Sequence, residues 1–199
     1  GARGNSGVIS SLLFRGFSKA LQGKKTADAK DLVQALEKGV EGAYKAVMKP
    51  TEGTMLTVAR VASEEAAASG IADAVELWQL VCTAAQRALD NTPEQLPVLK
   101  KAGVVDAGGA GFLLILQGML NEVRGEEMPA DEEPAQAEKA DFGAIPAEDI
   151  TFAFDTVFIV RKPSPNVNLE PFRTYLNGIG DSLVIGEDDE AFKVHVHTN

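Results

Sequence analysis

The chain has few cysteines, few basic residues and no long apolar run, and each shortage excludes a class of protein. Its single cysteine, Cys82, cannot form an internal disulfide and is predicted to be a small core residue, as suits a reducing cytoplasm. No apolar run reaches the roughly 18 residues of a membrane span. With 29 acidic against 19 basic residues, the net charge of −10 argues against nucleic acid as a partner. We therefore expect a cytoplasmic globular protein.

The acidic charge is concentrated in one segment, residues 125–149. This segment holds nine acidic residues and one lysine, together with Pro129, Pro134 and Pro146, and it lacks apolar periodicity. Such a composition predicts a solvated linker between two folded units, with a binding tail as the alternative.

Residues 1–124, before this linker, are predicted to be entirely helical. Apolar residues recur at spacings of three and four, and glycine or proline marks the ends of the segments. Short connections and the absence of alternating strands indicate an all-α unit. The expected helices span residues 6–22, 28–49, 54–69, about 73–89, 92–101 and 108–123, with Thr92 as the N-cap of the fifth.

The pattern changes to an alternating period in residues 150–199. Strands are expected at 151–160, 182–185 and 192–197, with a helix at 169–176 after the first, which is a βαββ arrangement. The expected fold class is thus α plus α/β, an incomplete helical domain followed by the start of a small α/β domain. About 50 residues make a marginal core, so we expect the chain to be a fragment of a longer protein.

Three of the predicted helices begin at a glycine-bearing turn that carries a polar side chain. A helix N-terminus presents free N–H groups and a partial positive charge, and glycine allows a ligand to approach the backbone. Three such starts predict helix ends that converge on a phosphate-bearing ligand, most simply a nucleotide, although neither a Walker A loop nor a dinucleotide fingerprint is present. The turns are Gly4-Asn5-Ser6-Gly7, Glu52-Gly53-Thr54 and Asp106-Ala107-Gly108-Gly109.

Each turn also has an ordinary structural interpretation. Ser6 and Thr54 could act only as N-caps, and Met55 could be either a core residue or an apolar contact for a base. Gly108 and Gly109 cost helix stability, which either close helix packing or the approach of a ligand would offset.

The only two histidines, His195 and His197, occupy alternate positions of the last predicted strand and therefore share one face. This spacing suits a metal site or a pair of phosphoryl acceptors, and Asp155 could be a third ligand if its strand pairs with this one. A solvated strand face is the alternative.

Several segments together resemble the bacterial fatty acid kinase A-subunit family. They are GARGNSGVI, EGTMLTVAR, LPVLKKAGVVDAGGAGF, GDSLVIG and KVHVHTN, and they follow the family's order over nearly the whole chain. The family's N-terminal domain is similar to the L subunit of dihydroxyacetone kinases, an all-helical barrel, and its middle domain is α/β. A separate fatty-acid-binding protein presents the acyl chain for phosphorylation to an acyl phosphate.

The resemblance implies cofactors and a role for each candidate residue. ATP and Mg²⁺ would bind at the helical domain, with room for a second metal such as Zn²⁺ at the histidines, and a homodimer is compatible with it. His195 and His197 match paired histidines implicated in activity, and Asp155 would join them as a metal ligand. The residues placed at the nucleotide are Gly4, Asn5, Ser6, Gly7, Thr54, Met55, Asp106, Gly108 and Gly109.

Two departures from the family pattern leave other functions open. The family's DGDTGTNM segment, which supplies magnesium carboxylates, precedes the first block and is not in this sequence, so we expect weak Mg-ATP binding and no catalysis by this chain alone. Asp155 lies in a strand where the family usually has a cysteine. The alternatives are a phosphotransferase component that resembles dihydroxyacetone kinase, or a non-catalytic module that binds a nucleotide or a protein.

Overall fold

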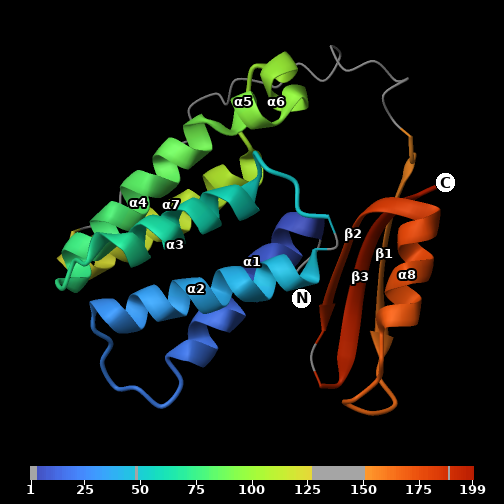
Figure 1. Cartoon of the computed structure of the whole chain (residues 1–199), viewed down its shortest axis with the longest axis horizontal. Helices are drawn as coiled ribbons and strands as arrows, with labels where there is room; N and C mark the ends of the chain where they lie inside the picture. Colours follow the sequence, from blue (N-terminus) through green and yellow to red (C-terminus); the bar gives the residue numbers. More distant parts are fainter. Residues whose placement is uncertain (1–3, 48, 127–150, 188) are drawn as a thin grey trace.

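A helical unit and a small α/β unit lie side by side in the computed structural model (Figure 1). The structure describes residues 4–47, 49–126, 151–187 and 189–199, so the predicted acidic linker lies almost wholly outside the described residues. The expected fold class is confirmed. The helical unit contains α1 (Gly4–Ala20), α2 (Ala29–Ala46), α3 (Met55–Ser69), α4 (Ala74–Asp90), α5 (Thr92–Gln95), α6 (Pro97–Ala102) and α7 (Ala107–Arg124). The α/β unit contains β1 (Phe154–Arg161), α8 (Glu170–Ile179), β2 (Gly180–Glu187) and β3 (Ala191–Thr198).

Helices α1 and α2 form an antiparallel hairpin whose backbones approach closely. A Cβ added at Gly16 would collide with the Lys38 carbonyl, and one at Gly39 would lie 2.6 Å from the Leu13 carbonyl oxygen. Asp28 begins α2 by accepting a hydrogen bond from the Asp31 N–H at 2.9 Å. The two glycines therefore set how near α1 lies to α2.

Helices α3, α4 and α7 pack together and enclose most of the core of the helical unit. Trp78 is buried on α4 and donates its indole N–H to the Leu116 carbonyl on α7 at 3.0 Å. Cys82 is also buried, and burial raises the pKa of its thiol to about 11, so it stays protonated as a core residue. Among the described helices none is long and apolar enough to cross a membrane.

Two predicted helix starts were wrong in detail. Helix α1 begins at Gly4, so Ser6 lies inside its first turn and is not its N-cap. Thr92 is not an N-cap either, because Asn91 precedes α5 and the buried Thr92 hydroxyl donates to the Leu89 carbonyl at 2.7 Å. The single short helix expected here is broken at Leu96, whose extended backbone separates α5 from α6.

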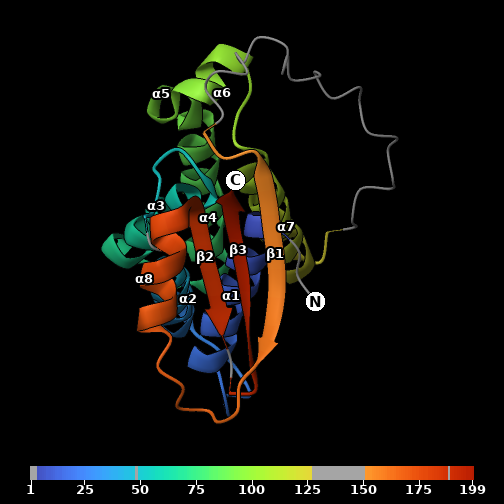
Figure 2. The same ribbon diagram turned by 90° about the vertical axis from the view of Figure 1, so that its right-hand side faces the viewer.

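The α/β unit is a three-stranded antiparallel sheet in the order β1-β3-β2, with β3 in the middle (Figure 2). One face carries Leu183, Ile185, Val194 and Val196, which pack with Leu176 of α8 into a separate apolar core. The opposite face turns toward the helical unit, where Val184 forms an isolated backbone bridge with Val47. Arg15 of α1 also donates to the Glu187 carbonyl at 2.6 Å, so the two units meet along β2.

Candidate functional site

A cavity of about 460 Å³ lies where the N-termini of α1, α3 and α7 meet. The three turns singled out in the sequence, although far apart along the chain, each contribute to its wall, and so do α8 and β2. Its volume is within the range of small-molecule pockets. We call it the helix-start cavity; its polar lining is Asn5, Ser6, Lys49, Thr51, Thr54, Asp106, Asn177, Asp181 and Ser182.

At the start of α1, Asn5 is the residue with an unsatisfied polar group. Its side-chain oxygen is buried and has no hydrogen-bond partner among the described residues. A buried acceptor without a donor costs about 1–3 kcal/mol, so this oxygen suits a ligand that carries a donor. The neighbouring Ser6 is exposed at the cavity, and Gly4 has a φ of +67°, a conformation that glycine adopts without strain.

At the start of α3, the buried Thr57 fixes the turn that precedes the helix. Its hydroxyl accepts hydrogen bonds from the N–H of Gly53 at 2.9 Å and of Thr54 at 3.4 Å, and it donates to Glu52 at 2.9 Å. Glu52 also accepts from Arg60 at 2.8 Å. Burial opposes ionisation of Glu52, but these hydrogen bonds keep its pKa below the usual range. The Glu52 carboxylate is therefore ionised and hydrogen-bonded within the turn.

At the start of α7, the side chain of Asp106 connects two helix N-termini. It accepts a hydrogen bond from the Gly109 N–H at 2.6 Å as the N-cap of α7, and it interacts with the Met55 N–H of α3. Burial raises the pKa of Asp106, and these two backbone donors oppose the rise. By accepting hydrogen bonds from both helix starts, Asp106 keeps α3 next to α7.

The two glycines that follow Asp106 both allow close packing. A Cβ at Gly108 would lie 3.0 Å from Ser6 Oγ and 3.2 Å from Met55 Cε, and one at Gly109 would lie 3.0 Å from Val58 Cγ2. Packing thus accounts for the small size of both residues. At Gly108 the packing brings the starts of all three helices together: Gly108 does not line the cavity itself, but it contacts Ser6 and Met55, which do.

Sequence reasoning did not select five polar residues of this wall, which are Lys49, Thr51, Asn177, Asp181 and Ser182. Lys49 and Thr51 precede the Glu52 turn, and the lysine beside a predicted helix start was a signal available from the sequence. Asp181 and Ser182 belong to β2, and their position shows only once the sheet is placed against the helices. Met55 is 5% exposed and accepts a hydrogen bond from Ser10 at 3.5 Å, so it is mostly a core residue.

The second group of predicted residues is also brought together by the fold. Strand β1 pairs with β3 so that Asp155 lies opposite His197, and one possible ligand atom from each of Asp155, His195 and His197 lies within 4.8 Å of the others. The two imidazole rings are 5.2 Å apart between centroids. We call these three residues the histidine group.

His195 is the buried member of the histidine group, with 3% of its surface exposed. Its Nδ1 lies 3.1 Å from Asp155 Oδ1, yet neither ring nitrogen has an aligned hydrogen-bond partner in the described part of the chain. Burial lowers the pKa of His195, which keeps the imidazole neutral and its lone pair available. A neutral buried histidine without partners, beside a second histidine and a carboxylate, fits the donor set that Zn²⁺ prefers.

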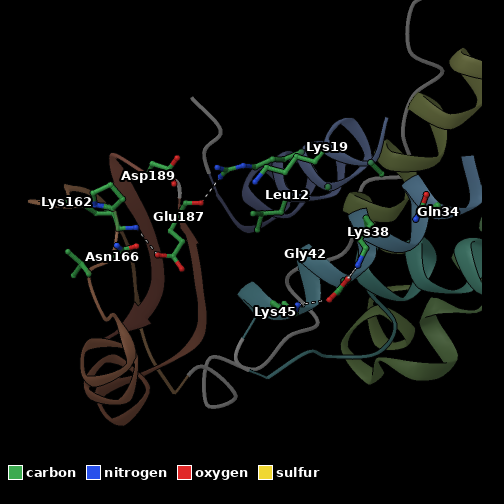
Figure 3. Close-up of a pocket in the computed structure, with 16 residues that line it drawn as sticks. Leu12, Lys19, Gln34, Lys38, Gly42, Lys45, Lys162, Asn166, Glu187 and Asp189 are labelled. Carbon is green, nitrogen blue, oxygen red and sulfur yellow. Dashed lines mark hydrogen bonds and ion pairs between the residues drawn. The ribbon is translucent and has the colours of Figure 1, made fainter. Parts of the chain in front are cut away.

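A larger cleft, of about 960 Å³, lies between the α1–α2 hairpin and the β2–β3 turn (Figure 3). Three of its five basic side chains pair with acidic ones. Lys38 and Lys45 both pair with Glu41, at 2.7 Å and 2.6 Å, and Lys162 lies 3.3 Å from Glu187. Among the described residues that line this cleft, none begins a helix and none is a predicted site residue, so its size alone does not make it the better candidate.

Comparison with known proteins divides the chain in the same way as the structure. Residues 1–121 match the DAK2 domain, and residues 151–199 match the middle domain of fatty acid kinase A-subunit-like proteins. Uncharacterized proteins of Staphylococcus saprophyticus and Staphylococcus epidermidis are each 45% identical to the whole chain, and one from Staphylococcus aureus strain RF122 is 43% identical. The chain spans 38% of the length of these curated relatives.

Proposed function

Since the chain belongs to the DAK2-domain family and continues into a middle domain of the fatty acid kinase type, we propose that its helix-start cavity binds the phosphates of ATP in a kinase-type subunit. The observation that supports this most is the meeting of three helix N-termini at one cavity. Each end carries a partial positive charge and backbone donors, two of which Asp106 already accepts, and together the three ends favour a ligand with several negative charges.

The polar lining of the cavity supports a division of roles. Lys49 would supply a positive charge and the Ser6 hydroxyl a donor for phosphate oxygens, whereas the Thr54 hydroxyl already donates to the Thr51 carbonyl at 2.9 Å. Because Asp106 and Asp181 would repel bare phosphate, a divalent cation such as Mg²⁺ is expected to accompany the nucleotide. When bound, Mg²⁺ would neutralise charge on the phosphates during transfer, while the helix ends and side chains hold the nucleotide in place.

For the acceptor, we propose a fatty acid presented by a separate binding protein, with an acyl phosphate as product. The match of residues 151–199 to a fatty acid kinase middle domain supports this acceptor over dihydroxyacetone. In such a transfer an oxygen of the fatty acid carboxylate would form a bond to the γ-phosphorus, and the bond from that phosphorus to the bridging oxygen of ADP would break. A homodimer is compatible with this proposal.

For the histidine group, we propose a metal site, with Zn²⁺ as the fitting ion. Asp155, His195 and His197 would supply one oxygen and two nitrogen ligands, and the unpartnered nitrogens of His195 support this assignment. Three protein ligands leave the fourth position of a tetrahedral zinc site open. The ion could therefore act as a Lewis acid or stabilise the fold of the domain.

Calorimetric titration of this chain with Mg-ATP and with magnesium tripolyphosphate would test the nucleotide proposal. If the phosphates dominate recognition, tripolyphosphate should bind nearly as well as ATP. Lys49→Ala should weaken both ligands by about tenfold or more, since one charge-assisted contact contributes about 1.5–3 kcal/mol. Lys25→Ala, in the exposed connection between α1 and α2, is the matched control. Equal loss in both variants, or no binding at millimolar ligand, would contradict the proposal.

The acceptor requires its own experiment. Acyl phosphate can be trapped with hydroxylamine when the kinase protein is incubated with ATP and a fatty acid held by its binding protein. Formation of a hydroxamate with the fatty acid, and no ADP release with dihydroxyacetone, is the expected result. ADP release with dihydroxyacetone alone would favour the polyol kinase alternative.

A further inference from the structure

Strand β2 contains an irregularity where it meets the helix-start cavity. Asp181 pairs with His197 and Val184 pairs with His195, so three steps on β2 match two steps on β3. The extra residue is a β-bulge, and it places Asp181 and Val184 on the sheet face that carries both histidines. Without it, Asp181 would point toward the α8 side, because side chains alternate along a strand.

Ser182, within this bulge, has a φ of +54° and is the only described residue other than glycine in the left-handed region. Such a conformation costs a serine about 1 kcal/mol and persists only where the surroundings impose it. Here both neighbours are fixed. Gly180 has no room for a Cβ, which would collide with the His197 carbonyl, and Val184 is held by its bridge to Val47.

The bulge connects the two candidate sites. On one side, Asp181 Oδ1 lies 3.1 Å from His197 Nδ1. On the other side, Asp181 and Ser182 line the helix-start cavity together with Asn5 and Thr54. A carboxylate that accepts the Nδ1 proton of a histidine fixes its tautomer and leaves Nε2 free for a metal. Among the described residues, Asp181 thus both lies within ion-pair distance of a member of the histidine group and forms part of the cavity wall.

We infer that Asp181 is a positioning residue that couples metal binding at the histidine group to nucleotide binding in the helix-start cavity. A metal on His197 would hold the imidazole, and with it Asp181 and the bulge, in the arrangement that completes the cavity wall. By thermodynamic reciprocity, a nucleotide in the cavity would tighten the metal site by the same factor. This inference rests on the proposed nucleotide site.

The test measures two affinities and their dependence on each other. The chain is loaded with one equivalent of Co²⁺, whose visible absorption reports its coordination, and excess metal is removed before calorimetric titration with Mg-ATP. We expect the Co²⁺-loaded chain to bind Mg-ATP about tenfold more tightly than the metal-free chain, which corresponds to about 1.4 kcal/mol of coupling. The Co²⁺ spectrum should change as the nucleotide binds.

Asp181→Ala should abolish this tenfold difference and weaken Co²⁺ binding by about 10–100-fold, as loss of an outer partner of a metal ligand usually does. Asp181→Asn, which keeps an acceptor for His197, should retain part of both effects. Asp189→Ala, an exposed carboxylate near the opposite end of the same hairpin, is the control and should behave as wild type. Thermal unfolding of all three variants separates loss of coupling from loss of fold.

The outcomes separate failure of the coupling by Asp181 from failure of the proposed nucleotide site. If Co²⁺ and Mg-ATP each bind but independently, the coupling role of Asp181 is overturned while the nucleotide site stands. Retention of full coupling in a folded Asp181→Ala variant would overturn it in the same way. If Mg-ATP binds neither the loaded nor the metal-free chain, both the inference and the proposed function fail.

Discussion

Gly108 on α7 and Ser6 on α1 are so close that a Cβ on the glycine would lie 3.0 Å from the serine hydroxyl oxygen. The contact joins the first turns of two helices that are about a hundred residues apart in sequence. Because Met55 of α3 lies 3.2 Å from the same Cβ position, this glycine sets the separation of all three helix starts. The shape of the helix-start cavity depends on it.

Gly108→Ala should therefore alter ligand binding more than stability. Alanine favours the helix by about 1 kcal/mol, which offsets the strain of pushing Ser6 and Met55 aside by a few tenths of an ångström. Mg-ATP affinity, measured by calorimetry, should fall severalfold. Gly111→Ala, on the same helix with nothing within 4 Å of its Cβ position, should raise stability and leave affinity unchanged. Similar affinities in the two variants would contradict this account.

Thr57→Val should destabilise the helical unit. Valine keeps the volume but leaves the N–H groups of Gly53 and Thr54 without their acceptor, and a buried unsatisfied donor costs about 1–3 kcal/mol. Urea unfolding would measure the change. Thr83→Val is the control, since that exposed hydroxyl bonds only within its own helix to Gln79. An equally small effect in both variants would show that Thr57 does not hold the turn.

Substitutions at Ser182 should rank by their tolerance of a left-handed backbone. Ser182→Gly should be at least as stable as Ser182→Ala, and Ser182→Val should be the least stable, by about 1–2 kcal/mol relative to glycine. Chemical denaturation of the three variants gives the order directly. If valine is tolerated as well as glycine, the backbone at the β2 bulge is not left-handed in solution.

The metal-free α/β unit should lose stability as the pH falls below 6.5. Burial lowers the pKa of His195 from that value, with Asp155 opposing the shift and His197 and Lys193 adding to it. The unfolded chain then binds a proton at a higher pH than the folded chain, so stability is present above pH 6.5 and is lost as the pH falls toward the lowered pKa. Urea unfolding of wild type and His195→Gln between pH 5 and 8, with a chelator present, should show a smaller slope in the variant.

The fold could be predicted from the sequence where a local signal decided it. Asp28 and Asp73 mark two helix starts as N-caps, and Gly70, Gly103 and Gly125 follow helix ends in left-handed conformations. The prediction that Thr92 is an N-cap was wrong because its hydroxyl makes a tertiary contact, accepting a hydrogen bond from the Asp106 N–H at 3.0 Å. A residue that looks like a cap can be used by a distant segment instead.

The candidate site was predictable only in part, for a similar reason. Alternation along one strand placed His195 and His197 on one face, and pairing of β1 with β3 then brought Asp155 to them. Asp181 and Ser182 could not be predicted as cavity residues, because their position depends on a one-residue bulge and on the packing of β2 against α1 and α2. Local patterns do not encode how two units meet.

Amide hydrogen exchange of this chain with and without saturating Mg-ATP tests the central claim most directly. It maps the site even when binding is weak. The account predicts slower exchange in the first turns of α1, α3 and α7 and at the Asp181–Ser182 bulge, with no change along Lys38 to Lys45 at the larger cleft. Protection confined to that cleft, or unchanged exchange at all three helix starts, would contradict the assignment of the helix-start cavity as the nucleotide site.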